Sequence, residues 1–522
     1  DFIAVMPVKK QLCLLAIVAM GASLNGCTTL GPDYEEPEVA WLDTWETDLY
    51  GRVVTPDGPE DLELHHWWKV FNDPILDELI ETAIQENPSK RIAGLKILES
   101  RAVLGIATGA KYPQLQQVGS SVGYVNTQQH GGQMGGSDQS LTAYQADFNI
   151  GWEVDFWGRV QRSIESADAA FFSSISNYHD AQVLLNAQVV NLYFTFRTAK
   201  ERIAIARKNA DIQFSSLEIT RQLYESGQQS ELDLQQARTQ YLATLASIPA
   251  LEISFTKTQN ALSAILGYQP GVLAILKGVP KGLPRLQPTM IAGIPARILM
   301  RRPDVRRAAW LVAAQSALIG VAEADLYPGI SLVGKLGWSG NDQSGAAETG
   351  SAALGSVFTW NIFDHGRIRN NVRVQDARLQ QAIESYQDVV LKAAQELDSA
   401  AITIVKSDEQ NAILVQSVQA AERSLELAMT RYQEGYASFQ RVLDAQQAVA
   451  RQTETELVNQ GVQISAVISF YKALGVGWQD RPVSDLVPKT TGEVMSSRSD
   501  WGDLLTSPLP PSPAILLPQE KQ

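Results

Sequence analysis

The feature that most constrains this chain is that its two halves repeat one another. One motif reads Tyr224, Gly227, Ser230, Leu234 and Ala237 in the first half, and its second copy, at identical spacing, reads Tyr432, Gly435, Ser438, Val442 and Ala445. A Gly-Arg pair with a Trp six residues before its glycine also occurs twice, at 158–159 and 366–367. A duplication of this length defines the folding unit. Each half is therefore predicted to run helix, β-hairpin, very long helix, tight turn and long helix.

The length and charge of the chain narrow the possible architectures. A chain of 522 residues would ordinarily form about three or four domains, but two copies of about 200 residues indicate one architecture with added segments. The net charge of −14 argues against nucleic acid as a partner. Beyond the N-terminus, no apolar run reaches the roughly 18 residues that a membrane-spanning helix requires.

Residues 1–26 have the form of a secretory signal peptide. Lys9 and Lys10 precede an apolar segment at 12–22, which is too short to span a bilayer. The segment ends in Leu-Asn-Gly-Cys at 24–27, which resembles the cleavage box of bacterial lipoproteins, and Thr28 favours sorting to the outer membrane. Cys27 is therefore predicted to become the lipidated N-terminus. An ordinary signal peptide with a chance cysteine is the alternative.

The remaining chain divides into an arm, two repeats, a linker and a tail. The predicted bounds are 27–66 for the N-terminal arm, 67–270 for the first repeat, 271–302 for the linker, 303–477 for the second repeat and 478–522 for the tail. The first repeat is predicted to open with a short helix at 67–87 and a second helix that the Tyr-Pro at 112–113 stops. The tail is predicted to be an irregular belt that ends in disorder.

Each repeat contains a stretch with the period of a β-strand. Apolar and polar side chains alternate over 144–156, and the two hairpins are predicted at about 115–156 and 329–363. One face is apolar with Trp and Tyr near the ends, which is typical of transmembrane β-barrels; a half-buried strand of a soluble sandwich is the alternative. Four strands cannot close a barrel, and lipid does not tolerate open edges. The sheet is therefore either soluble or completed by strands from other chains.

After each hairpin the apolar pattern becomes helical and persists for about 65 residues without proline. The long helices and the helices that follow them are predicted at about 157–267 and 365–474. At about 1.5 Å per residue, each uninterrupted helix would be roughly 100 Å long. The seven-residue period predicts left-handed coiled-coil packing. Many interior positions of this period are Ala or Gln, which predicts close but polar contacts.

A short turn follows each of the long helices. Gly227 and Gly435 suit the left-handed position just after a helix C-terminus. Ser230 and Ser438 suit the N-cap of the helix that follows. Only the first copy, which has Asp233 three residues after its serine, approximates a capping box.

The sequence offers no group of residues that catalysis would require. It contains no phosphate-binding loop, no zinc-protease motif, no Cys/His cluster and no nucleophile elbow. His65 and His66 lack a third metal ligand nearby in the sequence, so a surface or core pair is favoured over a metal site. We therefore predict that the protein is not an enzyme and has no cofactor.

Together these features resemble the TolC-type outer-membrane efflux proteins, over about residues 65–477. The segment IPARILMRRPDVR at 294–306 is similar to the linker signature of the lipoprotein branch that serves RND-type pumps. The resemblance implies a mainly α-helical homotrimer, in which three duplicated units form a twelve-stranded membrane β-barrel continued by a long α-helical barrel. It implies a passive conduit, lipid-anchored in the outer membrane, that connects an inner-membrane RND-type transporter and a periplasmic adaptor to the exterior.

The resemblance also assigns roles to the ends of the long helices. The turns that contain Gly227, Ser230, Gly435 and Ser438 are implied to form the periplasmic tip, which docks the adaptor and closes at rest. Docking and closure would then both depend on the geometry of these two turns.

Five residues near the tip are implied to form a gate. Asp444 matches an acidic residue that rings the aperture, and Gln440, one turn earlier, is expected to line the same constriction. Tyr432 matches a tyrosine that bonds to an acid on the neighbouring hairpin, here Asp233. Arg441 stands where some members carry a second acid, and it is expected to pair with Asp444 three residues later.

Two questions stay open from the sequence. A lipid-anchored periplasmic coiled-coil scaffold without a pore is the alternative function, although a scaffold has no use for the apolar strand face at 144–156. Within the conduit interpretation, the substrate is a drug, a metal ion, a lipid or an exported protein, because the pump rather than the conduit mostly sets specificity.

Overall fold

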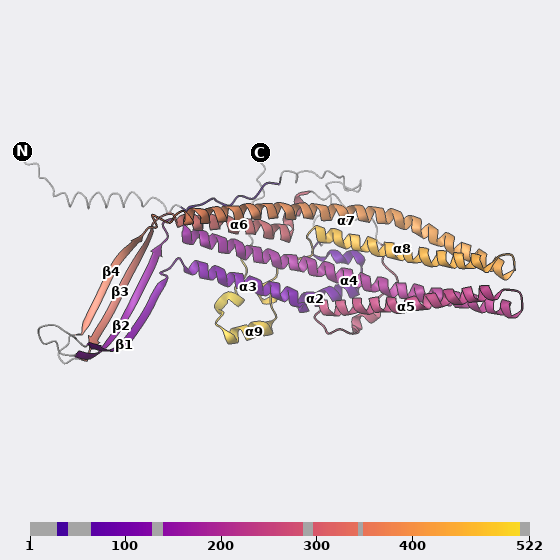
Figure 1. The fold of residues 1–522 in the computed structure, drawn as a ribbon, viewed down its shortest axis with the longest axis horizontal. Coiled ribbons are helices and arrows are strands. Elements are labelled where there is room, and N and C mark those ends of the chain that lie inside the picture. Colours follow the sequence, from indigo (N-terminus) through magenta and orange to yellow (C-terminus); the bar gives the residue numbers. More distant parts are fainter. Residues whose placement is uncertain (1–28, 40–63, 128–138, 286–295, 343–347, 512–522) are drawn as a thin grey trace, which may run out of the picture.

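The computed structural model describes residues 29–39, 64–127, 139–285, 296–342 and 348–511. The chain is strongly elongated, with a β-sheet at one end and two helical hairpin tips at the other (Figure 1). The segments that the sequence repeats lie side by side along this length, so each end of the molecule is built from both halves of the chain.

The sheet, as far as the structure describes it, contains four antiparallel strands from both repeats. They are β1 (Leu115–Thr127), β2 (Gln139–Val154), β3 (Gly329–Asn341) and β4 (Thr349–Thr359), in the spatial order β1-β2-β3-β4. The central strands join the two copies, because Phe148 of β2 lies opposite Val118 of β1 and Leu336 of β3. Alternation along each strand then assigns successive side chains to opposite faces of the sheet.

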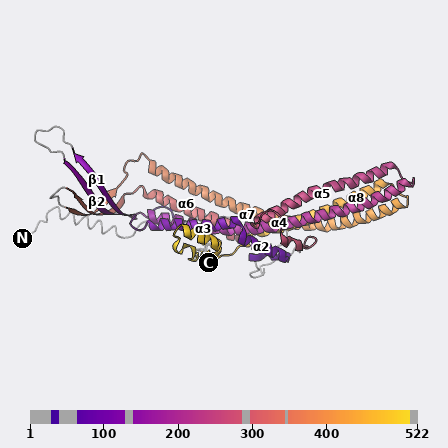
Figure 2. The ribbon, with the colours of Figure 1, turned by 90° about the horizontal axis from the view of Figure 1, so that it is seen from below.

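The four longest helices of the described chain form two hairpins of equal dimensions. Both α4 (Arg159–Glu225) and α7 (Arg367–Gln433) have 67 residues, and both α5 (Glu231–Ile265) and α8 (Phe439–Ala473) have 35. At about 1.5 Å per residue, the longer helices span roughly 100 Å. Contacts join α4 to α5, α7 to α8 and α4 to α8, so the hairpins run side by side, as Figure 2 shows from a second direction.

Two 22-residue helices complete the half of the molecule next to the sheet. They are α3 (Pro88–Gly109), which precedes β1, and α6 (Pro303–Ala324), which precedes β3. Both begin with proline, whose missing N–H is not needed in the first turn of a helix. α3 packs on α4, while α6 contacts both α4 and α7. The half of the molecule next to the sheet is therefore broader than the tips.

The prediction of a single helix at 67–87 is wrong. A 3-10 helix, η2 (Leu64–Phe71), is followed there by α2 (Pro74–Glu86). Asn72 between them has a φ of 48°, and Asp73 caps α2 by accepting a hydrogen bond from the Ile75 N–H at 3.1 Å. Pro74 cannot donate a backbone hydrogen bond to an earlier turn, so one helix cannot continue through this point.

The tail is more regular than the sequence predicts. It contains η6 (Val483–Asp485), α9 (Lys489–Arg498) and η7 (Gly502–Leu505), while the linker contains η3 (Ala274–Gly278) and η5 (Ala296–Arg301). Leu486 and Met495 are buried in a cluster with side chains of α3 and α4. Arg101 of α3 also donates to the carbonyl oxygens of Leu504 and Ser507. Packing on the long helices orders this segment, and the predicted disordered end lies outside the described residues.

The largest hydrophobic core lies where η2, α2, α4, α6, α7 and α8 meet, around Leu76, Tyr193 and Tyr386. A smaller core lies near the tips, and it is made of Leu217, Ala237, Tyr432, Phe439, Val442 and Leu443. Among the helices that the structure describes, none combines the length and the apolarity needed to cross a membrane.

Candidate functional site: the exposed sheet and the helical tips

One face of the sheet carries exposed apolar side chains. Directly paired residues share a face, and the register brings together Val118, Val122, Tyr124, Phe148, Leu336, Trp338, Leu354 and Phe358. Their exposed fractions reach 79% for Val118 and 88% for Leu354. Soluble monomers rarely leave a contiguous apolar surface of this kind in water, so this face requires an apolar environment or a partner.

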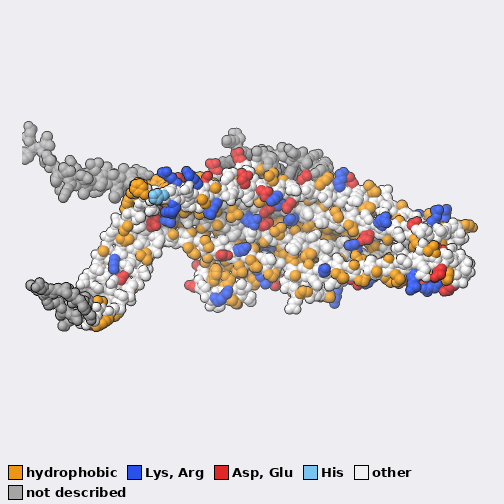
Figure 3. All heavy atoms as spheres, viewed as in Figure 1, with side chains coloured by type: hydrophobic (Ala, Val, Ile, Leu, Met, Phe, Trp, Pro, Cys, Tyr) orange, Lys and Arg blue, Asp and Glu red, His pale blue; other side chains and the backbone are white. Residues whose placement is uncertain are grey.

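The opposite face of the sheet is mainly polar. Its side chains include those of Gln117, Gln145, Asp147, Asn149, Glu153 and Lys335. The side-chain amides of Gln145 and Asn149 donate hydrogen bonds to the Asp147 carboxylate. In Figure 3, charged side chains are sparse over the sheet and more frequent over the helices. The two faces of the sheet therefore differ in chemistry, one being mainly apolar and the other mainly polar.

Both outer strands of the sheet are unpaired on one side. β1 and β4 stand at the ends of the strand order, so within the described residues each has one neighbouring strand. Their outer backbone N–H and C=O groups are available to pair with another strand. In lipid such groups would have to be paired, because no water can satisfy them there.

Tryptophans secure the junction where the sheet meets the helices. The indole N–H of Trp152 donates to the Lys111 carbonyl at 3.2 Å, and that of Trp360 donates to the Leu326 carbonyl at 3.0 Å. The indole N–H of Trp157, in the first repeat, donates to the carbonyl of Pro328, in the second repeat, at 2.8 Å. Aromatic residues at this level are typical of the interface girdles of membrane β-barrels.

Both tip turns have the predicted left-handed glycines. The φ angle is 74° at Gly227 and 79° at Gly435. The Gly227 N–H donates to the Tyr224 carbonyl and the Gln228 N–H to the Leu223 carbonyl, and the second turn repeats this pattern. The arrangement is a Schellman motif, which ends a helix in a fixed conformation. Two rigid turns of the same shape therefore lie at the far end of the molecule from the sheet.

The two serines that follow these turns differ in their capping. The Ser230 hydroxyl accepts a hydrogen bond from the Asp233 N–H at 3.3 Å, as predicted for an N-cap. Ser438 occupies the N-cap position of α8, but its side chain makes no capping hydrogen bond. Its carbonyl oxygen instead accepts from the Arg441 N–H at 3.2 Å. The side-chain cap predicted for Ser438 is therefore wrong.

Tyr432 is buried between the two hairpins rather than bonded to Asp233. Its side chain is 1% exposed and packs on Phe439, with ring centroids 5.2 Å apart. Its hydroxyl donates to the Thr220 hydroxyl at 3.4 Å, so the predicted bond to Asp233 is wrong within one chain. Burial raises the pKa of Tyr432, and the nearby Asp233 carboxylate adds to this shift.

Asp444 is exposed near the start of α8, and its hydrogen-bond partner is Gln440. The Gln440 side-chain amide donates to the Asp444 carboxylate at 2.9 Å. Arg441 is exposed, and the Asp444 carboxylate bonds to Gln440 instead of pairing with Arg441, which corrects the predicted pairing. The spacing of four residues suits the Gln440 contact. The two predicted constriction residues thus form one unit.

Polar contacts that the sequence did not identify hold the two hairpins together. The Gln446 amide of α8 donates to the Ser216 hydroxyl of α4 at 2.6 Å in a buried position. Further from the tip, Arg202 of α4 pairs with Glu454 of α8. The polar residues at interior positions of the heptads were the sequence feature that indicated such contacts. Their partners could not be identified, because they belong to the other half of the chain.

The signature segment at 294–306 has a structural role at Arg302. This side chain forms an ion pair with Asp304 at 2.8 Å and another with Glu396 of α7 at 3.2 Å. It also donates to the Ala473 carbonyl at the end of α8 at 2.6 Å. Arg302 therefore ties the start of α6 to α7 and α8 and is not available to a ligand.

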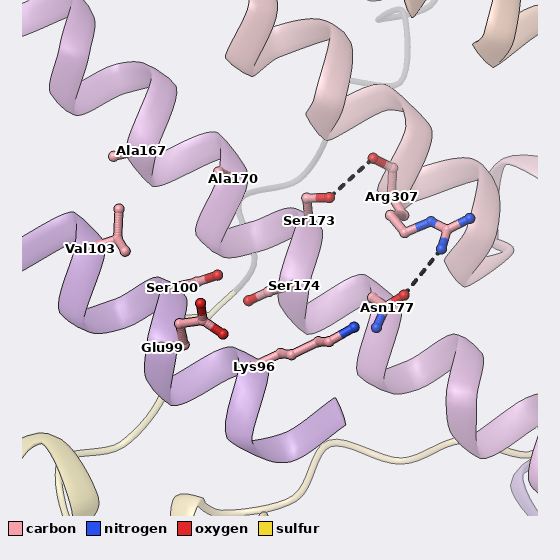
Figure 4. Close-up of a pocket in the computed structure, with 10 residues that line it drawn as sticks. All are labelled: Lys96, Glu99, Ser100, Val103, Ala167, Ala170, Ser173, Ser174, Asn177 and Arg307. Atoms are coloured by element: carbon pink, nitrogen blue, oxygen red, sulfur yellow. Dashed lines mark hydrogen bonds between the residues drawn. The ribbon is translucent and has the colours of Figure 1, made fainter. Parts of the chain in front are cut away.

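The described surface also contains a groove between α3, α4 and α6, lined by both polar and apolar side chains, with a volume of about 330 Å³. Figure 4 shows Lys96 and Glu99 of α3 beside Ser174 of α4, and Arg307 of α6 donates a hydrogen bond to the Asn177 side chain at 3.1 Å. Within the described ranges, no three His, Cys, Asp or Glu side chains are placed to hold a metal ion.

The histidine pair has structural partners. The His65 ring bonds to the Trp478 carbonyl and the His66 ring to the Gln479 side chain. Cys27, the predicted lipidation site, lies outside the described residues.

Known proteins similar to this chain are outer-membrane channels. A model of the outer membrane efflux protein family matches residues 79–268 and 294–476. The pyoverdine export outer membrane protein OpmQ of Pseudomonas putida is 26% identical over 479 residues, which cover 91% of this chain and 99% of that protein. The cation efflux system protein CusC of Escherichia coli is 28% identical over 479 residues, covering 90% and 99%.

A solved structure gives the same result. The outer-membrane channel OprN matches this fold with a TM-score of 0.78 at 30% sequence identity, covering 87% of this chain and 100% of that chain. The predicted resemblance is thus confirmed, and the pore-free scaffold finds no support. The protein is an efflux channel of the outer membrane, and the chain belongs to the outer membrane efflux protein family.

Proposed function

We propose that three copies of this chain form a passive conduit, with a β-barrel closed by four strands from each copy. The observation that carries the proposal is the sheet, which has one apolar exposed face, one polar face and two unpaired edges. Closing three such sheets on one another pairs every edge. It also places the apolar face in lipid and the polar face around a water-filled lumen.

The helical part continues this conduit through the periplasm to an adaptor and an inner-membrane RND-type transporter. The Schellman turns at Gly227 and Gly435 are rigid, and Ser230 and Ser438 follow them. Exposed apolar side chains stand at the same turns, with Leu232 65% and Tyr436 81% exposed. Rigid turns with exposed apolar residues suit docking to a helical partner.

The gate of the conduit is assigned to the start of α8. Three copies of the Gln440–Asp444 unit would meet near one axis, where a ring of carboxylates attracts cations. Arg441, exposed beside it, would moderate this preference. The buried Tyr432–Thr220 contact holds the hairpin that carries the ring, and the charge of Asp233 lies nearby.

The anchor and the substrate complete the proposal. Acylated Cys27 would insert into outer-membrane lipid, in addition to the barrel. OpmQ is named for pyoverdine export and CusC for cation efflux, so related channels serve chemically different cargo. We therefore assign substrate choice to the pump and adaptor.

Native mass and single-channel conductance test the proposal on the purified full chain. We expect trimers that conduct, and in Asp444→Ala a higher conductance with weaker block by multivalent cations. The matched control is Glu225→Ala, which removes an exposed acid from the other tip turn and should leave conductance unchanged.

Each alternative has a distinct result. A monodisperse monomer that conducts ions would contradict the shared barrel, and trimers that never conduct would favour the scaffold. Unchanged conductance in Asp444→Ala would show that Asp444 does not form the constriction. Gln440→Ala would then be the next variant to record.

A further inference from the structure

The start of the N-terminal arm is fixed at the corner where β2 turns into α4. The Leu30 N–H donates to the Trp157 carbonyl at 3.2 Å. The next residue of the corner, Gly158, has a φ of 72°, and a Cβ there would lie 2.7 Å from the Thr29 side chain. The arm therefore occupies space that any other residue at this corner would fill.

Arg162, on the first turn of α4, binds the backbone of the arm through several hydrogen bonds. Its guanidinium donates to the Leu30 carbonyl at 2.8 Å, the Gly31 carbonyl at 3.1 Å and the Asp33 carboxylate at 2.8 Å. The side chain is only 6% exposed, whereas arginine usually lies at the surface. A guanidinium carries five donors in a rigid plane, which lets it hold several acceptors of one short segment.

The arm crosses α6 with its backbone in direct contact with the helix. Gly31 has a φ of 84°, and a Cβ there would lie 2.5 Å from the Gly320 Cα. A Cβ on Gly320 would lie 2.3 Å from the Leu30 carbonyl oxygen. One turn earlier on α6, the Ser316 hydroxyl donates to the Pro32 carbonyl at 3.4 Å. Neither glycine leaves room for a side chain.

The duplication shows that these residues serve the arm rather than the corner itself. At the matching position of the second repeat, Asn370 replaces Arg162, yet Gly366 still turns the chain into α7 with a φ of 85°. Gly105 of the first repeat corresponds to Gly320, and it has nothing within 4 Å of a built Cβ. A corner of this kind therefore forms without the arginine and without the close crossing.

We infer that Gly158, Arg162, Ser316 and Gly320 form an arm seat that positions the lipid anchor beside the junction of sheet and helices. This inference rests on the proposed lipidation of Cys27. A chain extends at most about 3.6 Å per residue, so an anchor two residues before Thr29 can reach no further than about 7 Å from it. The acyl chains then enter the membrane next to the tryptophans of the junction. Arg162 is a positioning residue, because it holds the arm and not the lipid.

Hydrogen exchange of the full lipoprotein in lipid nanodiscs tests the arm seat, with intact mass recorded in parallel. In Arg162→Ala and in Gly320→Ala we expect exchange of the Leu30 amide to rise at least tenfold, with acylation unchanged. The matched controls are Arg159→Ala, which removes a neighbouring exposed arginine of α4, and Gly105→Ala. Both controls should leave the arm as protected as in the parent protein.

The outcomes separate the seat from the lipidation on which it rests. Protection of Leu30 that persists in both Arg162→Ala and Gly320→Ala would overturn the arm seat while leaving acylation intact. The arm seat would also be overturned if exchange rose equally in β3 and α6, because the variants would then loosen the whole corner. An unmodified Cys27 would instead overturn the anchor itself, whatever the exchange of the arm.

Discussion

The two copies of the repeat have kept their dimensions while their surroundings have changed. The long helices are equal in length, as are the shorter ones, and both tip turns are Schellman motifs. Yet Tyr224 is 39% exposed, whereas its counterpart Tyr432 is 1% exposed. Exposed Glu231 in the first copy corresponds to fully buried Phe439 in the second. The two copies thus share their helix lengths and turn conformations. A few substitutions decide which hairpin buries its aromatic side chains in the small core near the tips.

The two long helices also differ in their neighbours. α4 packs against α2, α3, α5, α6 and α8, whereas α7 packs against η5, α6 and α8. α7 accordingly exposes large apolar side chains, among them Leu391 at 54% and Ile413 at 68%. In the proposed trimer, this is the surface on which a neighbouring copy would pack.

The largest difference between the copies is expected at the tip tyrosines. Tyr432→Ala should destabilise the tip by about 3 kcal/mol or more, because it leaves a cavity in the small core. Tyr224→Ala should cost less than about 1 kcal/mol, because its side chain is already exposed. Hydrogen exchange of the tip peptides measures both. Equal effects would show that burial does not distinguish the two hairpins.

In the sheet, by contrast, the copies should behave alike. Ile150 and Phe358 occupy matching positions on the apolar face, so an Asp at either should destabilise the inserted chain, on the order of 1 kcal/mol, and impair assembly. The control Asn149→Asp lies on the polar face and should be mild. Trimer yield in the outer-membrane fraction provides the measurement. Loss of assembly from only one of the two apolar positions would contradict a common lipid-facing surface.

A pH dependence should separate two aspartates at matching positions of α4 and α7. Burial and the Asp304 carboxylate raise the pKa of Asp180 to about 6, while Asp388 is exposed and pairs with Lys392 at 2.7 Å. Because the folded form binds the proton more tightly, stability should fall as pH rises from about 4 through 6.

Asp180→Asn should therefore stabilise α4 at pH 8, on the order of 1–2 kcal/mol, and change little at pH 4. Asp388→Asn is the control and should leave the pH profile as it is. Hydrogen exchange of the α4 peptides at the two pH values gives the result, and an unaltered profile in Asp180→Asn would refute the assignment.

The smallest effect on stability is expected at the tip glycines. Gly227→Val and Gly435→Val should each strain a left-handed position by about 1 kcal/mol. Efflux should nevertheless be lost while trimers remain inserted, since the proposed docking would depend on the shape of the turn. Gly271→Val, at an ordinary φ with open surroundings, is the control. Resistance of a strain that depends on this channel measures efflux, and tolerance of one substitution would assign docking to the other hairpin.

The features that the sequence predicted well are local ones. Helix lengths, strand alternation and the left-handed Gly227 and Gly435 follow from periodicity and turn chemistry within one segment. The break at Asp73-Pro74 was also local, and its Asn-Asp-Pro sequence was an available signal. Two other errors were local, namely the side-chain cap at Ser438 and the pairing of Arg441 with Asp444. The remaining errors concern distant partners, because Tyr432 bonds Thr220 in the other half of the chain and the tail packs on α3 and α4. No periodicity reports which distant side chain fills a given space.

Disulfide cross-linking of the sheet edges tests the shared barrel most directly. One cysteine replaces Gly355 on β4, and the second is moved along the same face of β1 through Gln117, Gly119, Ser121 and Gly123. Within one chain these strands lie at opposite edges of the sheet. The account predicts that at least one pair yields covalently linked trimers on a denaturing gel. Cross-links only within single chains, or none in any pair, would contradict a barrel built from several copies.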